Sequence, residues 1–359
     1  MQQYLVFILL LNSTLAFCQA YPDSIYNDDP LQKIPVGVEE ASHRIIEAKG
    51  GTVDQVRIHP PSWWVGMAHP RLELLISDQN IRDFDLTIDY PGIDVRTVKR
   101  LENPNYLFVD LELSETIQAG QFEIQLKKGK EERSYSYELK EKAVDKQRIQ
   151  GLTSADLMYL IMPDRFANGD RSNDSFSDLE QVGINRDKVF FRHGGDLIGV
   201  MEHLDYVQQL GVTAIWLNPV LENDQAYESY HGYAITDHYR VDPRFGKNEQ
   251  YRYLADICQA RGIKLIKDII HNHVGDQHWF IKDLPSKDWI HQFDAFTKTS
   301  YRAPTLMDPY AAETDKEIML DGWFDHHMPD LNQKQPQLAN YLIQNHIWWI
   351  EYAGIDGYR

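Results

Sequence analysis

The sequence predicts two folded domains: an N-terminal antiparallel β-sandwich (Ig-like), followed by an incomplete (β/α)8 TIM barrel with an insertion after strand 3. Over residues 36–142, apolar residues alternate with polar ones and no helical pattern intervenes. From residue 151 to residue 359, short apolar runs alternate instead with amphipathic helical stretches. The length of 359 residues fits two or three domains.

Residues 1–20 are predicted to be a signal peptide. Their apolar run, Leu5 to Leu11, is too short to span a bilayer, and compact residues follow it up to Ala20. We therefore expect export to the periplasm or the medium. Lipidation of Cys18 is the alternative, but the bulky Phe17 before it fits a lipidation signal badly. No other stretch is long and apolar enough for a transmembrane segment.

Charge and cysteine content narrow the classes of function. The formal net charge of −18 argues against binding to nucleic acid, which needs a basic face. Aromatic residues make up 12% of the chain, and their rings suit stacking against sugars. Once the signal peptide is removed, Cys258 is the only cysteine, so no internal disulfide is expected. Cys258 lies in a helical pattern, which favours a small buried residue over a reactive thiol.

The sandwich is predicted from four alternating runs separated by turns. The runs are Phe84–Tyr90, Leu107–Leu113, Phe122–Leu126 and Tyr135–Leu139. Asn103-Pro104-Asn105 and Lys128-Gly129-Lys130 have the composition of turns between strands. The adjacent Trp63 and Trp64 allow two interpretations: an exposed platform for sugars, or one ring in the sandwich core and the other against the next domain. The second is favoured, because tryptophan is usually mostly buried.

The barrel is predicted from four apolar strands with helices between them. The strands are 156–162, 212–217, 264–270 and 354–359, and the helices are 197–210, 248–261 and 336–353. Strands that alternate with helices form parallel βαβ units, and a barrel of such units has its active site at the carboxyl ends of the strands. The insertion, residues 274–335, follows the third strand and is therefore expected beside that site.

Five segments carry a resemblance to a known family. They are Gly211–Pro219, Tyr230–Tyr233 with Asp242–Gly246, Asp268–His273, Met328–Asn332 and Gly354–Arg359. In this order they resemble the alpha-amylase superfamily (glycoside hydrolase family 13), from about residue 155 to the last residue. The preceding sandwich and the Met-Pro-Asp-Leu-Asn form of the fourth segment make the chain most similar to the cyclomaltodextrinase, neopullulanase and maltogenic amylase group.

The resemblance implies a retaining glycosidase that cleaves α-1,4 bonds, or also α-1,6 bonds, of maltooligosaccharides, cyclodextrins or pullulan. Such an enzyme needs a nucleophilic carboxylate and an acid about 5 Å apart. In relatives, the nucleophile is an aspartate two residues after the strand-four arginine, here Arg359, and the acid glutamate follows later. We therefore expect this chain to be an inactive fragment of an active parent. The alternative is a truncated, non-catalytic α-glucan-binding protein. Relatives often pair as homodimers through the N-terminal domain, and the resemblance implies the same pairing as an expectation here.

The resemblance assigns roles to five residues. Arg359 would hold the nucleophile ionised, and Asp268 would brace its neighbours. His273 would hydrogen-bond the sugar, Tyr233 would stack beneath the same sugar, and Asp330 would organise the insertion beside the cleft. The alternatives are a surface arginine, a structural histidine and an ordinary packed tyrosine. We expect His273 and Arg359 to lie together at one mouth of the barrel.

The sequence contains candidate ligands for two kinds of metal site. By resemblance, a Ca²⁺ site would use oxygen ligands from two segments: Asn168, Asp170, Asn173, Asp174, Asp196 and the Gly194 carbonyl. The alternative is a solvated Asn/Asp turn. His271 and His273, with His326 and His327, also suggest a transition-metal hydrolase. That interpretation is disfavoured, because alternate residues of a strand face opposite sides.

Overall fold

The computed structural model describes residues 45–142 and 149–359. The predicted signal peptide, residues 1–20, and the first residues of the predicted sandwich, 36–44, lie outside the described residues. None of the helices in the described part of the chain has the length and apolar character that a bilayer crossing requires.

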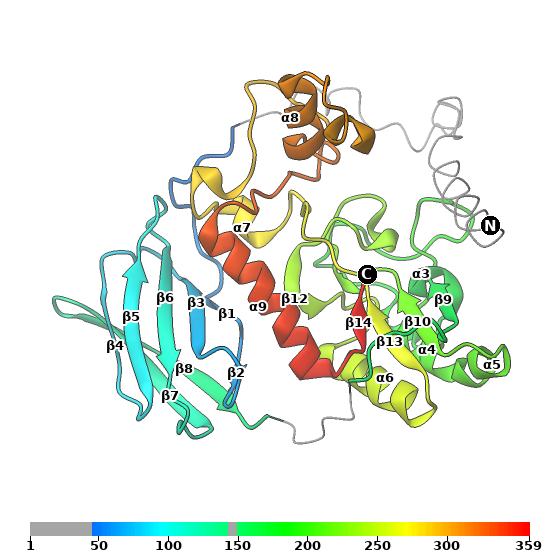
Figure 1. The fold of residues 1–359 in the computed structure, drawn as a ribbon, viewed down its shortest axis with the longest axis horizontal. Coiled ribbons are helices and arrows are strands. Elements are labelled where there is room, and N and C mark those ends of the chain that lie inside the picture. Colours follow the sequence, from blue (N-terminus) through cyan, green and yellow to red (C-terminus); the bar gives the residue numbers. More distant parts are fainter. Residues whose placement is uncertain (1–44, 143–148) are drawn as a thin grey trace. The chain divides into compact units, whose positions relative to one another are not determined.

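Two four-stranded sheets form the N-terminal sandwich (Figure 1). One sheet has the order β1-β3-β6-β5 and the other has the order β2-β8-β7-β4. Their strands are β1 (Arg57–His59), β2 (Trp63–Trp64), β3 (Arg71–Ser77), β4 (Asp85–Ile88), β5 (Ile93–Lys99), β6 (Tyr106–Leu113), β7 (Gly120–Lys128) and β8 (Glu131–Lys140). All neighbouring strands are antiparallel except β2 and β8. The Ig-like sandwich expected from the alternating runs is therefore present.

Strand β3 has no alternating pattern because both of its faces are covered. Every residue from Leu72 to Ser77 is buried. Its outer side meets helix α9 (Pro336–Ala353). The side-chain oxygen of Gln344 in α9 accepts a hydrogen bond from the Glu73 N–H at 2.8 Å, and the side-chain nitrogen of Gln344 donates to the Glu73 carbonyl at 2.7 Å. A strand buried on both sides reads as a continuous apolar run.

Four parallel strands in the order β14-β13-β10-β9 form the sheet of the second domain (Figure 1). They are β9 (Met158–Ile161), β10 (Ala214–Leu217), β13 (Lys264–Lys267) and β14 (Gly357–Tyr358). Helices α4 (Leu197–Glu202), α5 (Leu204–Gln209), α6 (Asn248–Ala260) and α9 connect them. This alternation is the expected incomplete TIM barrel. The single helix predicted over 197–210 is two helices that meet at His203, whose Nδ1 bonds to the Gly199 carbonyl at 2.8 Å.

Helix α9 has the bounds that the sequence predicted, and its ends explain why. Pro336 occupies the first turn, where a missing N–H costs nothing. The Gln335 side chain accepts a hydrogen bond from the Leu338 N–H at 2.8 Å and caps the start. Gly354 closes the helix with φ = 68°, a left-handed conformation that glycine adopts without strain.

The insertion between β13 and α9 contains mostly short helices and loops. Its helices are α7 (Trp279–Lys282), η4 (Lys287–Trp289), η5 (Ala303–Leu306) and α8 (Glu313–Asp321). Asp283, just after α7, joins the insertion to the sandwich. The buried Asn103 and Asn105 donate side-chain hydrogen bonds to the Asp283 carboxylate at 2.7 and 2.9 Å. The predicted turn at Asn103–Asn105 therefore also anchors the insertion.

Trp63 and Trp64 do not form an exposed platform. Both rings are buried in the core. The Trp64 ring centroid lies 6.3 Å from that of Trp348 in α9, and the Trp348 indole N–H donates to Ser62. The favoured interpretation, with one ring in the sandwich core and the other against the next domain, is confirmed. Cys258 is also buried as expected, and burial raises the pKa of its thiol to about 12.

Candidate active site

Asp268 is the centre of a polar cluster at the carboxyl end of β13. It is buried, and its carboxylate accepts hydrogen bonds from the Trp216 indole N–H at 3.0 Å and the Tyr233 hydroxyl at 2.9 Å. Arg359 Nη1 lies 3.3 and 3.4 Å from its two oxygens. The Arg359 guanidinium also lies over the Trp216 ring, 4.5 Å from the centroid. One carboxylate therefore braces three side chains from different elements: Trp216 within β10, Arg359 just after β14, and Tyr233 after the turn that precedes strand β12 (Asp237–Val241).

Tyr233 is presented by a tight turn. Glu228 and Gly232 have φ angles of 54° and 82°, and a Cβ on Gly232 would lie 2.0 Å from the Pro219 carbonyl oxygen. Only glycine fits there. The Tyr233 N–H donates to His231 Nδ1 at 2.9 Å, which fixes the end of the turn. Burial, and then the charge of Asp268, raises the pKa of Tyr233, so its hydroxyl stays protonated as a donor.

His273 lies on the other side of Tyr233. Its Nε2 is 3.1 Å from the Tyr233 carbonyl oxygen, and its ring stacks on Phe324 at a centroid distance of 4.5 Å. Burial lowers the pKa of His273 to about 4, so the ring is neutral near pH 7. A neutral ring that donates from Nε2 leaves Nδ1 as an acceptor. His273 and Arg359 are therefore linked through Tyr233. His273 bonds to the Tyr233 carbonyl, and Arg359 contacts Asp268, which in turn accepts from the Tyr233 hydroxyl.

Asp330 links the insertion to the end of β13. His291 Nδ1 lies 2.7 Å from one of its oxygens, and the Asn272 side-chain amide donates to the other at 3.0 Å. Burial raises the pKa of Asp330 to about 6, although His291 acts in the opposite direction. Asp330 is also paired with His273 as an isolated β-bridge. All five expected residues of the site therefore belong to one connected network.

Sequence reasoning missed several aromatic residues beside this network. Phe324 and Tyr301 from the insertion are 39% and 51% exposed, and their ring centroids are 5.2 Å apart. The Tyr227 hydroxyl hydrogen-bonds His327 Nδ1 at 3.0 Å. These residues lie in loops without periodicity, so the sequence indicated them only through the high aromatic content of the chain. Their exposed rings are suited to contact with a sugar.

The four histidines considered for a transition metal have different neighbours. The His271 ring packs against His346, and the His273 ring packs against Phe324. His326 stacks on Phe296, while His327 bonds to Tyr227. Within residues 45–142 and 149–359, no group of three or more His, Cys, Asp or Glu side chains is arranged to hold a metal ion.

Some of the oxygens expected to bind Ca²⁺ already accept hydrogen bonds within the protein. The Asp196 carboxylate accepts from the backbone N–H groups of Gly169, Asp170 and Gly199, and the Asp170 carboxylate accepts from Ser172. Asp196 thus caps helix α4.

Two of the other candidate ligands, Asn168 and Asp174, lie against Gly194. The side-chain oxygens of Asn168 and Asn173 are buried and have no hydrogen-bond partner. The Asn168 amide nitrogen donates to Asp174 Oδ1 at 2.6 Å, and a Cβ on Gly194 would lie 2.6 Å from that same oxygen. Unsatisfied amide oxygens next to a carboxylate are suited to a hard cation such as Ca²⁺.

Comparison with known proteins gives two family matches. Residues 160–359, more than half of the chain, match the family described as "Alpha amylase, catalytic domain". Residues 57–143 match the family described as "Cyclomaltodextrinase, N-terminal". The two matches cover the barrel and the sandwich, respectively.

Individual relatives agree with these matches. Neopullulanase 2 of Thermoactinomyces vulgaris is 35% identical over 211 residues, which cover 56% of this chain and 33% of that protein. A cyclomaltodextrinase of Bacillus sp is 33% identical over 210 residues, covering 56% and 34%. A cyclomaltodextrinase of Thermoanaerobacter pseudethanolicus is 35% identical over 213 residues, covering 58% and 34%. The chain spans about a third of the length of these relatives.

Proposed function

Because the chain belongs to the alpha-amylase family, we propose that the protein containing it is a retaining α-glucan hydrolase. Its substrates would be maltooligosaccharides, cyclodextrins or pullulan, cleaved at α-1,4 bonds, with α-1,6 bonds as a second target. The observation that carries this proposal is the Asp268 cluster, which holds Tyr233 and Arg359 together at the carboxyl ends of the barrel strands. That end of a TIM barrel is where active sites lie.

The geometry supports a different role for each of three residues around one glucose ring. Arg359 is half exposed beyond its contact with Asp268, so its remaining N–H groups are free to orient a second carboxylate. In the family, the nucleophile follows this arginine by two residues, and an adjacent guanidinium keeps such a carboxylate ionised. Tyr233 would supply a stacking face for the sugar, and neutral His273 would accept a hydrogen bond from a sugar hydroxyl at Nδ1.

The test is product analysis on the full-length gene product. Purified protein is incubated separately with maltooligosaccharides, a cyclodextrin and pullulan, and the products are separated by chromatography. Shortened α-glucans from at least one substrate support the proposal, and loss of products in Arg359→Ala ties the activity to this site. Binding without cleavage would support the second candidate, a non-catalytic glucan-binding protein. Neither binding nor cleavage would reject both.

We also propose a structural Ca²⁺ ion. Asn168, Asn173, Asp174 and the Gly194 carbonyl would hold it, and Asp170 and Asp196 would complete the set of oxygen ligands. The unsatisfied amide oxygens of Asn168 and Asn173 support this assignment. The ion would join the loop around residue 170 to the segment at Gly194 and stabilise both.

Export and self-association complete the proposal. The apolar run at Leu5–Leu11 supports export, which fractionation of cells expressing the chain with and without residues 1–20 would test. Its resemblance to dimeric relatives supports a homodimer through the sandwich. Sedimentation of the intact protein and of a form lacking the sandwich would test that pairing.

A further inference from the structure

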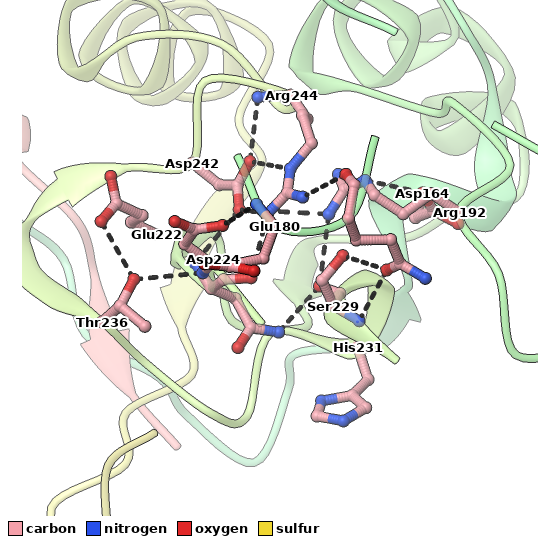
Figure 2. Close-up of polar contacts among 12 residues, drawn as sticks. Asp164, Glu180, Arg192, Glu222, Asp224, Ser229, His231, Thr236, Asp242 and Arg244 are labelled. Carbon is pink, nitrogen blue, oxygen red and sulfur yellow. Dashed lines mark hydrogen bonds and ion pairs between the residues drawn. The ribbon is translucent and has the colours of Figure 1, made fainter. Parts of the chain in front are cut away.

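A buried charge network lies behind the turn that presents Tyr233. It consists of Arg192, Arg244, Asp164 and Asp242, each at most 1% exposed, so two positive and two negative charges are buried together (Figure 2). Arg244 donates to both oxygens of Asp242 at 2.9 and 2.7 Å. Arg192 lies 3.6 Å from Asp164 and 4.0 Å from Asp242. Buried charges of this kind are tolerated only when they are paired.

The network fixes the backbone of two loops. Arg244 donates to the carbonyl oxygens of Gln181 at 3.2 Å and Asn223 at 2.9 Å. Asp242 accepts from the Asn223 N–H at 3.1 Å. Burial alone would raise the pKa of Asp242, but Arg244 and Arg192 lower it below its usual value, so the carboxylate stays charged.

The side chains of these two loops hold Ser229. Gln181 Oε1 accepts from the Ser229 hydroxyl at 2.6 Å and from its N–H at 3.1 Å. The Ser229 carbonyl accepts from the Asn223 amide at 2.8 Å and from Arg192 Nη1 at 3.2 Å. Ser229 is fully buried, and each of its polar groups is satisfied by this network.

Ser229 is the anchored residue of a turn that has a left-handed backbone conformation at both ends. Glu228 before it has a positive φ angle without being glycine, and Gly232 after it has no room for a Cβ. A non-glycine residue in the left-handed region persists only where its surroundings enforce it. Tyr233 comes directly after this turn.

We propose that Gln181, Ser229 and Arg192 are positioning residues for glucan binding. They hold the turn at residues 228–232 so that the Tyr233 ring lies beneath the sugar while its hydroxyl reaches Asp268. They touch no substrate themselves and act through Tyr233. The proposal rests on the glucan-binding role proposed above for Tyr233, and the experiments below separate the two.

The first experiment needs no substrate. Ser229→Ala removes the hydroxyl bond to Gln181, and hydrogen exchange is measured on amides 229–233 of this chain. Protection there is expected to fall about three- to tenfold, since one hydrogen bond contributes about 1 kcal/mol. Ser62→Ala is the matched control, because it also removes one buried serine hydrogen bond but lies in the sandwich. Unchanged protection in Ser229→Ala overturns the proposal.

The second experiment is a double-mutant cycle on the full-length protein. KM and kcat for a maltooligosaccharide are measured for wild type, Ser229→Ala, Tyr233→Ala and the double variant. Ser229→Ala is expected to raise KM about three- to tenfold, and this effect should vanish when Tyr233 is already absent. Ser62→Ala should leave KM unchanged in both backgrounds. Effects of Ser229→Ala and Tyr233→Ala that simply add overturn the positioning role.

A third variant keeps the proposal testable if Ser229→Ala misfolds. If Ser229→Ala does not fold, Gln181→Met removes the same acceptor without removing the serine, and the same outcomes apply. If wild type cleaves no α-glucan, the proposed function fails while the exchange experiment still decides whether the network holds the turn. If wild type cleaves but the cycle is additive, the positioning role fails alone.

Discussion

Lys267 shows how one residue can oppose the stability of the fold around it. Its side chain is fully buried on β13, and Nζ has no hydrogen-bond partner. Nζ lies 4.7 Å from the Trp349 ring centroid and 5.6 Å from that of Tyr251. Burial lowers the pKa of Lys267 to about 7. The charge of Asp268 offsets part of this penalty. A buried ammonium without a direct ion pair still destabilises the native state below that pH.

Lys267→Met is therefore expected to increase the free energy of unfolding, by about 1–3 kcal/mol at pH 6. The native pKa lies below the unfolded one, so wild type gains stability as the pH rises above 7. The advantage of the variant should shrink by at most about 1.4 kcal/mol per pH unit from there. Urea unfolding at pH 6 and pH 9 measures this. Lys264→Met on the same strand removes the ion pair with Asp156 and should not stabilise; equal gains from both variants would contradict the account.

At the scale of elements, the turn before Tyr233 should tolerate no side chain at Gly232. Gly232→Ala is expected to lower the free energy of unfolding by more than about 2 kcal/mol, because a Cβ would meet the Pro219 carbonyl at 2.0 Å. Gly211→Ala is the matched control, since Gly211 also has a positive φ of 76° but open space around its Cβ position. It should cost only about 1 kcal/mol. Similar losses in urea unfolding would argue against a close contact at Pro219.

The loop around Gly194 predicts a response to Ca²⁺. Added Ca²⁺ at about 100 times its Kd is expected to stabilise the protein by about 2.7 kcal/mol, measured as a rise in Tm after removal of metal with a chelator. Asp174→Asn should weaken this rise, because it removes a charged ligand beside Asn168. Asp187→Asn, an exposed carboxylate in a nearby loop, should leave it intact. A Tm that changes neither with chelator nor with added Ca²⁺ would contradict the proposed metal site.

At the scale of the whole molecule, buried histidines should make the protein sensitive to acid. Burial lowers the pKa of His59 and His238 to about 3, and that of His231, His273 and His346 to about 4. These rings stay neutral when folded but bind protons when unfolded below about pH 6.5. Stability should therefore fall as the pH drops from 6.5 toward 4, by up to about 1.4 kcal/mol per pH unit for each histidine.

Asp330 acts in the opposite direction over part of this range. Its pKa is raised to about 6, so its contribution is full below about pH 4 and is lost as the pH rises through 6. Burial also raises the pKa of four other carboxyls, those of Asp224, Glu228, Asp237 and Asp276, but Asp330 has the large rise. The five large histidine shifts outweigh these carboxyls, and the net slope of stability against pH should be positive between pH 4.5 and 6.5. Urea unfolding across this range tests it. Asp330→Asn should steepen the slope, and a flat profile in wild type would contradict the burial of these rings.

Local sequence pattern predicted the elements with a strong period or clear end signals, and missed those defined by distant contacts. Strands β7 and β8 alternate clearly, and α9 is bounded by Pro336 and Gly354. Strand β3 was missed because α9 covers its outer face. The motif residues Asp268, Tyr233 and Arg359 were found by resemblance. Gln181, which holds the turn at Ser229, comes from a loop without periodicity, and only the folded chain brings it there.

The anomeric form of the first product tests the central claim most directly. Full-length protein is mixed with a maltooligosaccharide, and proton NMR follows the new reducing end before mutarotation. If Tyr233 stacks beneath the sugar and Arg359, braced by Asp268, orients the nucleophile as proposed, double displacement predicts the α-anomer first and no product from Arg359→Ala. The β-anomer as the first product, or undiminished cleavage by Arg359→Ala, would contradict the account.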